Sequence, residues 1–198
     1  MPRGRPRSFD ADAALDVALR LFWRHGYEGT SIAALAEAVG VPVPSLYAAF
    51  GNKESLFLRA VEHYGGYAGR LYDEAFRARS AKAAARAVLM GEVELVCGRG
   101  TPEGCLMVQG ALATSPESEV VREKMARLRR QAEVEIAHCF ARFRSVGDLP
   151  DGWDPKTLAA YVMTVAAGLA VQAKSGMPRA QLTRVAEMAM LIWPEGSQ

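Results

Sequence analysis

Apolar residues recur every three or four positions along residues 117–145 of this 198-residue chain. An α-helix has about 3.6 residues per turn, so this spacing places them on one face of a long helix. The positions are Val121, Met125, Leu128, Ala132, Ile136, Cys139 and Phe143. The alternation of apolar and polar residues that strands show does not stand out elsewhere in the chain. The sequence therefore predicts an all-α fold of about nine helices.

Capping residues and glycines mark the ends of the predicted helices. Asp10 is a favourable N-cap, while Gly26 and Gly40 follow predicted helix ends. Asp154 and Pro155 combine a cap with a proline in the first helical position, which is a strong start signal. The predicted helices cover residues 11–25, 32–39, 43–50, a long stretch from 53, 81–98, 103–114, 117–145, 155–174 and 179–192.

Residues 31–50 follow the pattern of helix, glycine turn and helix. Gly40 sits where a tight turn between two helices requires a positive φ. The second helix is short enough to enter a DNA major groove, which is about 12 Å wide. Leu46 and Phe50 are expected to face the core. The residues expected to face outward are Val43, Pro44, Ser45, Tyr47 and Ala48. Three short helices can also form a bundle that has no DNA role.

This region closely resembles the N-terminal domain of TetR-family repressors over about residues 9–60. The resemblance is carried by Thr30-Ser31-Ile32, Gly40-Val41, Ser45-Leu46-Tyr47 and Phe50-Gly51-Asn52-Lys53-Glu54-Ser55-Leu56-Phe57. It implies a homodimer whose C-terminal domain varies with its ligand, with Tyr47 and Lys53 on the DNA backbone and the start of the third helix reading bases. The chain departs from the common pattern at Pro42 and Val43, where serine and then lysine or arginine are frequent. With Pro44 added, the reading edge is unusually apolar and offers few hydrogen bonds to bases.

Two further groups of residues are expected to touch DNA. The hydroxyls of Thr30 and Ser31 can donate to a phosphate at the positive end of a helix dipole. The segment Pro2-Arg3-Gly4-Arg5-Pro6 matches the core of the AT-hook, whose arginines lie in a narrow A·T minor groove. A non-specific phosphate contact by this arm is the alternative. The predicted DNA-contacting residues are Arg3, Arg5, Arg7, Thr30, Ser31, Val43, Pro44, Ser45, Tyr47 and Lys53.

Composition argues against several other classes of protein. The three cysteines, Cys97, Cys105 and Cys139, are too few for a disulfide framework and have no metal-ligand spacing. We expect them to be core residues and expect no metal or cofactor, although a redox role stays open. The weakly polar run over 158–173 is shorter than the roughly 20 residues of a membrane span. These features predict a cytoplasmic protein with no membrane partner.

Adjacent glycines at Gly65 and Gly66 interrupt the predicted fourth helix, where together they cost roughly 2 kcal/mol of helix propensity. A kink, a close helix crossing or room for a ligand would each explain them. We expect a mostly apolar effector site here, oriented by Gln109 or His138, for a hydrophobic or aromatic molecule. Its predicted lining is Tyr64, Tyr67, Leu71, Met90, Val93, Cys97, Met107, Gln109, His138 and Phe143.

The last two predicted helices are apolar nearly all round. Two such helices from each subunit would form a four-helix dimer interface, although they could also be buried within one subunit. The predicted interface residues are Leu158, Val162, Val165, Gly168, Leu169, Val185, Met188 and Ile192.

These features lead to one main functional hypothesis and two alternatives. We expect a transcriptional repressor, released from a palindromic double-stranded DNA operator by a small effector. Its parts would be a basic arm over 1–8, a helix-turn-helix domain over 9–52, and an effector-binding and dimerisation domain over 53–198. An effector-independent DNA binder is the first alternative. A small helical enzyme is the second, and we expect no enzyme because no catalytic triad, phosphate loop or carboxylate cluster is evident.

Overall fold

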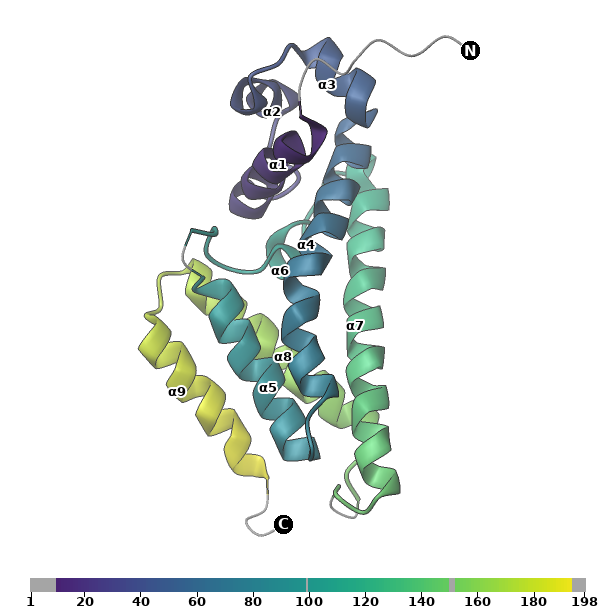
Figure 1. Ribbon diagram of the computed structural model, residues 1–198, viewed down its shortest axis with the longest axis vertical. Helices are drawn as coiled ribbons and strands as arrows, with labels where there is room; N and C mark the ends of the chain where they lie inside the picture. The colour runs from purple at the N-terminus through teal and green to yellow at the C-terminus, as the bar shows by residue number, and fades with distance from the viewer. Residues whose placement is uncertain (1–9, 99, 150–151, 194–198) are drawn as a thin grey trace.

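A three-helix domain stands at one end of the molecule, and a long helix leads from it into a larger helical bundle (Figure 1). This computed structural model describes residues 10–98, 100–149 and 152–193. Its α-helices are α1 (Ala11–His25), α2 (Ile32–Val39), α3 (Val43–Phe50), α4 (Lys53–Phe76), α5 (Ala81–Val96), α6 (Leu106–Gln109), α7 (Glu119–Ser145), α8 (Pro155–Lys174) and α9 (Arg179–Ala189), with short 3-10 turns η1 (Pro116–Ser118) and η2 (Met190–Ile192). No strand occurs in these ranges, so the all-α prediction is confirmed.

Side-chain caps begin most of these helices where the sequence places them. The Asp10 carboxylate accepts hydrogen bonds from the amides of Asp12 and Ala13, at 2.9 and 3.3 Å. Asn52 accepts from the amide of Ser55 at 2.7 Å, and Asp154 accepts from that of Thr157 at 2.9 Å. Such caps satisfy amides that have no partner within the helix, which explains why these boundaries are predictable from local sequence.

The helix predicted over 103–114 is wrong, because α6 contains only Leu106–Gln109. The peptide groups at its two ends, at Gly104 and Gly110, accept hydrogen bonds from α1 and from the loop that follows α1. The Trp23 indole donates to the carbonyl of Gly104 at 2.8 Å, and the Tyr27 amide donates to that of Gly110 at 2.8 Å. Gly104 also has a φ of +85°, which ends any regular helix. The remaining helices agree with prediction within about two residues at each end, except that residues 190–192 form a 3-10 turn.

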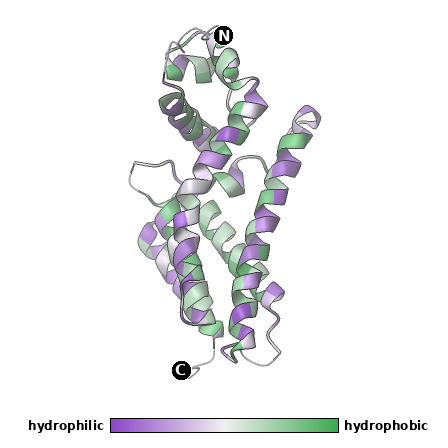
Figure 2. Ribbon diagram, turned by 45° about the vertical axis from the view of Figure 1, so that its right-hand side comes forward, coloured by the Kyte–Doolittle hydropathy of each residue, from purple (hydrophilic) through white to green (hydrophobic). Residues whose placement is uncertain are grey.

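The core follows the amphipathic faces of the helices, which carry both polar and apolar residues (Figure 2). Where the three-helix domain meets α4, the rings of Phe22, Tyr27 and Phe57 pack together, with ring centroids 5.0–6.4 Å apart. The predicted stripe on α7 is buried at both ends but only half-buried at Leu128 and Ala132. Both of these residues line a cavity described below.

The helix α8 is 20 residues long, so the expectation that this segment is too short to span a membrane is wrong. Among the described residues it is the one unbroken helix that is long and apolar enough to do so; α2 and α3 together would qualify only as a pair bent by 95°. The core helix of a bundle has the same composition, and α8 packs against α5, α7 and α9.

Candidate functional site

The turn between α2 and α3 presents α3 at the tip of the molecule (Figure 1). Gly40 adopts a left-handed conformation, with φ +77°, and its amide bonds to the carbonyls of Ala36 and Glu37. Leu46 and Phe50 point inward and are only 1% and 5% exposed. Burying these two side chains holds the opposite face of α3 outward.

The outward face of α3 is apolar, apart from two hydroxyl groups. Pro44, Tyr47 and Ala48 are exposed, while Val43 and Ser45 are half-buried. Pro42 begins the helix without a side-chain hydrogen bond. Pro44 has no amide hydrogen, and the Ser45 amide donates to the carbonyl of Pro42, so the first turn has few amides to offer a phosphate. A surface of this shape can enter a groove and touch thymine methyls.

Thr30 and Ser31 have different roles, although both were expected to donate to DNA. The Thr30 hydroxyl is 2% exposed and donates to the carbonyl of Gly26 at 2.7 Å, so the expectation that it binds a phosphate is wrong. Ser31 is exposed and caps α2 by accepting from the amide of Ala34 at 3.1 Å. Because the cap uses only its oxygen, its hydroxyl hydrogen stays available to a phosphate.

The Lys53 ammonium group lies 4.3 Å from the centre of the Tyr27 ring. Partial burial lowers the pKa of Lys53, and the nearby carboxylate of Glu28 opposes that shift. The aromatic contact holds the cation beside the start of α4, close to the α3 surface. The predicted contacts Arg3, Arg5 and Arg7 lie outside the described residues.

A cavity of about 970 Å³ lies between α4, α5, α7 and α8, with Cys105, Met107 and Val108 on a further side. Among the residues predicted to line an effector site, Tyr64 and Met107 do line it. Its walls are mostly aliphatic and aromatic, and charged residues of α4 and α7 surround its mouth. Its size and lining are typical of sites for small organic ligands.

The other predicted lining residues lie elsewhere. Val93 and Phe143 are buried in the core, and Met90 and Cys97 are half-buried away from the cavity. His138 is exposed on α7 and lines a smaller hollow of about 260 Å³. These residues have the same helical spacing as the residues that do line the cavity. Spacing alone does not show whether a helix face packs against the core, the cavity or solvent. The side chains of Tyr67 and Leu71 lie outside what the structure describes.

Gln109 was expected to orient an effector, and it binds the protein instead. Its side-chain amide donates to the main-chain carbonyl of Trp23 at 2.9 Å and to that of Glu103 at 3.4 Å. The polar group that sequence reasoning suspected is therefore satisfied within the chain, and it ties the segment around α6 to α1.

The glycine pair on α4 leaves space beside the cavity. The helix continues through both residues, and a Cβ atom at Gly65 or Gly66 would meet nothing within 4 Å. The close-crossing interpretation is therefore wrong, since no neighbour approaches either backbone. Gly65 lines the cavity, which agrees with the interpretation that the pair leaves room for a ligand.

Sequence reasoning missed Glu92, which lies on α5 and lines the cavity with only 7% of its surface exposed. Burial raises the pKa of its carboxyl to about 7, and a hydrogen bond with Cys105 opposes that shift. The Oε1 atom has no hydrogen-bond partner among the described residues. The sequence feature that could have indicated this residue is a glutamate within the apolar helix face formed by Leu89, Val93 and Val96.

The cysteines are spread through the structure. Cys105 and Cys139 are buried and Cys97 is half-buried, all with free thiols. Burial raises the pKa of the Cys105 thiol to about 12, so this thiol is protonated and a poor nucleophile at neutral pH. No group of three possible metal ligands is found within residues 10–98, 100–149 and 152–193.

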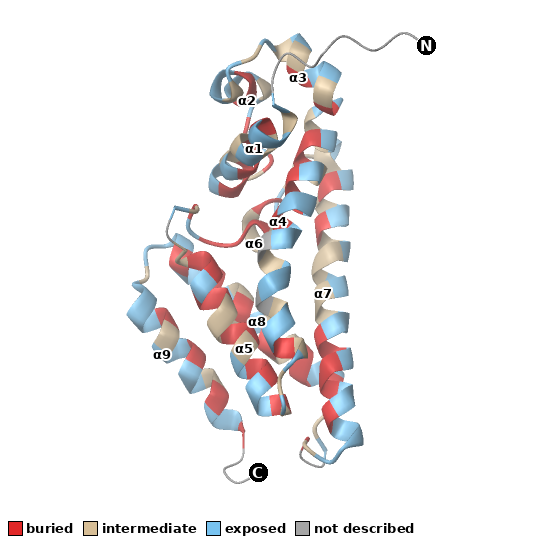
Figure 3. Ribbon diagram, in the orientation of Figure 1, coloured by how far each residue is buried: buried red, intermediate tan, exposed pale blue. Residues whose placement is uncertain are grey.

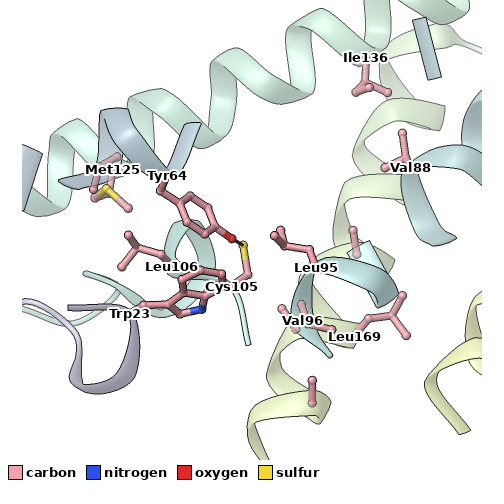
Figure 4. Packing of buried hydrophobic residues seen from close by; sticks show 14 of the residues in the cluster. Trp23, Tyr64, Val88, Leu95, Val96, Cys105, Leu106, Met125, Ile136 and Leu169 are labelled. Atoms are coloured by element: carbon pink, nitrogen blue, oxygen red, sulfur yellow. Dashed lines mark hydrogen bonds between the residues drawn. The ribbon is translucent and has the colours of Figure 1, made fainter. Parts of the chain in front are cut away.

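A chain of contacts joins the cavity wall to the three-helix domain (Figure 4). The Tyr64 hydroxyl donates to the Cys105 sulfur at 3.2 Å, and the Trp23 ring packs edge-on against that of Tyr64 at 4.7 Å. Trp23 also donates to the carbonyl of Gly104, the residue before Cys105. A shift of the cavity wall around Cys105 would therefore displace Trp23 and, with it, α1.

Exposed apolar side chains lie along α9 and η2, where α9 is largely exposed (Figure 3). Others are spread over the rest of the larger domain, at Leu112, Val120, Val134, Val146 and Val171. Met188, Leu191 and Ile192 are 67%, 78% and 44% exposed, Val185 is 40% exposed and Gly168 is exposed on α8. Leu158, Val162 and Leu169, also expected at a dimer interface, are at most 5% exposed within one chain, so they offer no surface to a partner. Val165 is half-buried.

Residues 14–60 match the family described as bacterial regulatory proteins, tetR family. The HTH-type transcriptional repressor ComR of Escherichia coli K12 is 32% identical, over 98% of this chain and 93% of its own length. The HTH-type transcriptional repressor BdcR of the same organism is 29% identical, over 94% of this chain and 90% of its own length. A cysteine mutant of the TetR family regulator CifR, complexed with 26-base-pair operator DNA, is 43% identical with a TM-score of 0.91, over 96% of this chain and 100% of that chain.

Proposed function

Because this chain belongs to the TetR family of bacterial regulatory proteins, we propose that it is a transcriptional repressor that a small effector releases from a palindromic operator. The observation that carries the proposal is the outward face of α3, which the buried Leu46 and Phe50 hold at the tip of the molecule. Its relatives ComR and BdcR are named as repressors, and CifR is solved on operator DNA.

In this mechanism α3 enters the major groove with Val43, Pro44 and Ser45 near base edges. The Tyr47 hydroxyl, the Lys53 ammonium and the Ser31 hydroxyl bind the flanking phosphates, where charge and hydrogen bonding set register without reading sequence. The arginines of the N-terminal arm add contacts in the minor groove or to phosphates, and they supply charge that α3 lacks.

The effector binds in the cavity between α4 and α7 and acts on α1 through Tyr64, Cys105 and Trp23. A ligand that binds only one spacing of the two DNA-binding domains shifts the population toward that spacing. The cavity favours this mechanism over the effector-independent alternative. A protein that only binds DNA has no use for a mostly apolar, ligand-sized cavity of about 970 Å³.

Selection of bound duplexes from a randomised pool tests the DNA-binding function. We expect enrichment of an inverted repeat, because a two-fold dimer places its recognition helices about 34 Å apart, one turn of DNA. Tyr47→Ala should weaken binding to the selected site by roughly tenfold, measured by fluorescence anisotropy, through loss of a phosphate contact in each half-site. The exposed α7 residue Val134 offers a control, Val134→Ala, that should bind as the parent does. A pool without enrichment would refute the proposal.

The same proposal makes the α8–α9 face the dimer interface. We expect Met188→Glu combined with Leu191→Glu to convert the dimer into a monomer at micromolar concentration, because four glutamates would then face an apolar interface. Light scattering measures the change, and operator affinity should fall with it. Val134→Glu, at an exposed apolar residue of α7, should remain a dimer. A double variant that stays dimeric would place the interface elsewhere.

A further inference from the structure

One oxygen of the Glu92 carboxyl group, Oε1, is a buried polar atom of the cavity wall without a hydrogen-bond partner among the described residues, although Cys105 hydrogen-bonds to the same carboxyl group. The buried Thr30 hydroxyl donates a hydrogen bond, and the other buried side-chain atoms of the described residues that lack a partner, Thr114 Oγ1 and Trp193 Nε1, do not line the cavity. A buried carboxyl oxygen without a partner costs free energy, so a native protein that carries one needs a compensating interaction. Glu92 lines the cavity, and that interaction can therefore come from a bound molecule.

Two tyrosines of α4, Tyr64 and Tyr72, line the same cavity as Glu92. Burial raises the pKa of both hydroxyls, and the negative charge of Glu92 adds to that shift. The Tyr64 hydroxyl already donates to Cys105 at 3.2 Å, while the Tyr72 hydroxyl only reaches the Met163 sulfur at 4.0 Å. This wall therefore combines a carboxyl group with two aromatic rings, which is a favourable setting for a cation.

The described part of the chain forms no ion pair with the Glu92 carboxyl group, although the cation of Arg129 lines the same cavity. The half-buried Arg129 on α7 lines the cavity, but its guanidinium donates to the carbonyl of Met107 at 2.8 Å. Arg59, Lys124 and Arg130 line the mouth and are exposed. A positively charged hydrogen-bond donor is therefore the group that would complete the site.

We propose that the cavity binds amines, in which a protonated primary or secondary amino group donates to Glu92 beside the rings of Tyr64 and Tyr72. The apolar body of the amine packs against Leu95, Met107 and Met163. This inference rests on the proposed function, since it names the chemical class of the effector for the same cavity. An ammonium group both donates a hydrogen bond to the buried carboxylate and balances its charge, whereas a neutral donor supplies only the hydrogen bond and an anionic group repels it.

Three probes with one apolar body test this class: phenylbutylamine, phenylbutanol and phenylbutanoic acid. We expect isothermal titration calorimetry at neutral pH to show the amine binding about tenfold more tightly than the alcohol, with the acid weakest. The inference is overturned if the acid or the alcohol binds as tightly as the amine, or if the amine does not bind.

Two variants then test where the amino group of the probe binds. Glu92→Gln keeps the shape of the side chain and should remove the advantage of the amine over the alcohol, whereas Glu74→Gln, at an exposed residue of α4, should keep it. Gly65→Leu should weaken all three probes, because it fills the cavity at a position with free space. An amine preference that survives Glu92→Gln would overturn the inference.

The two proposals fail in different ways. If the parent protein, with no probe present, does not bind an operator specifically, the repressor function is refuted and the probe affinities are unaffected. Specific operator binding together with equal probe affinities would refute the amine class alone.

Discussion

Pro44→Glu should lower operator affinity by about 1,000-fold. Pro44 is exposed in the first turn of α3, on the face that we place against DNA. A glutamate there brings a negative charge to the phosphates and base edges of each half-site, at a cost of about 2 kcal/mol in each, and every 1.4 kcal/mol is a factor of ten. Fluorescence anisotropy with the selected operator measures the change.

The fold should tolerate this substitution, because an acidic residue in the first turn of a helix interacts favourably with the helix dipole. Thermal unfolding should therefore change little. Ala83→Glu is the matched control: Ala83 is exposed in the first turn of α5, after the cap Ser80, and it lies in the larger domain. An equal loss of affinity in both variants would show a general charge effect, and parental affinity in Pro44→Glu would remove α3 from the DNA interface.

Glu92→Gln should stabilise the protein at pH 8 by about 3 kcal/mol. The pKa of Glu92 is about 7 in the folded chain, against an ordinary value of 4.5, because burial disfavours the carboxylate. The folded state thus holds the proton more tightly than the unfolded state. Its stability is greatest below pH 4.5 and falls as the pH rises to about 7, and each pKa unit corresponds to 1.36 kcal/mol. Glutamine resembles the protonated carboxyl and does not titrate.

Differential scanning calorimetry of the ligand-free protein at pH 5 and pH 8 measures this effect. At pH 8 the melting temperature of Glu92→Gln should exceed that of the parent by roughly 6–12 °C, and at pH 5 the two should nearly coincide. Glu74→Gln, at an exposed carboxylate, should follow the parent at both pH values. A difference that does not change with pH would mean that Glu92 is not the titrating group.

Local chemistry explains why the DNA-binding half was largely predictable. The caps Asp10 and Asn52 bond to amides two or three residues away, and Gly40 takes the positive φ of its own turn. Each of these interactions is complete within a few residues, so the sequence around it contains what is needed. The inward positions of Leu46 and Phe50 follow from the period of one short helix.

Two features that sequence reasoning got wrong have different causes. The Thr30 error is local: its side chain is buried and its hydroxyl donates to the carbonyl of Gly26, four residues earlier. The error at α6 comes from distant contacts. The segment around α6 bonds to Trp23 and Tyr27, about 80 residues earlier in the chain, and so forms only one helical turn. A sequence pattern cannot register partners at such a separation.

The sequence by itself determined the helical class and the helix-turn-helix, but it left three explanations open for the glycine pair on α4, and only the structure shows free space there. Only the tertiary structure decided which face of α8 is internal, because that helix is apolar nearly all round and periodicity cannot choose between its faces. It also decided that Glu92 is buried beside two tyrosines. The free energy of a buried carboxyl depends on groups from α4 and on the segment before α6, and these meet α5 only when the chain is folded.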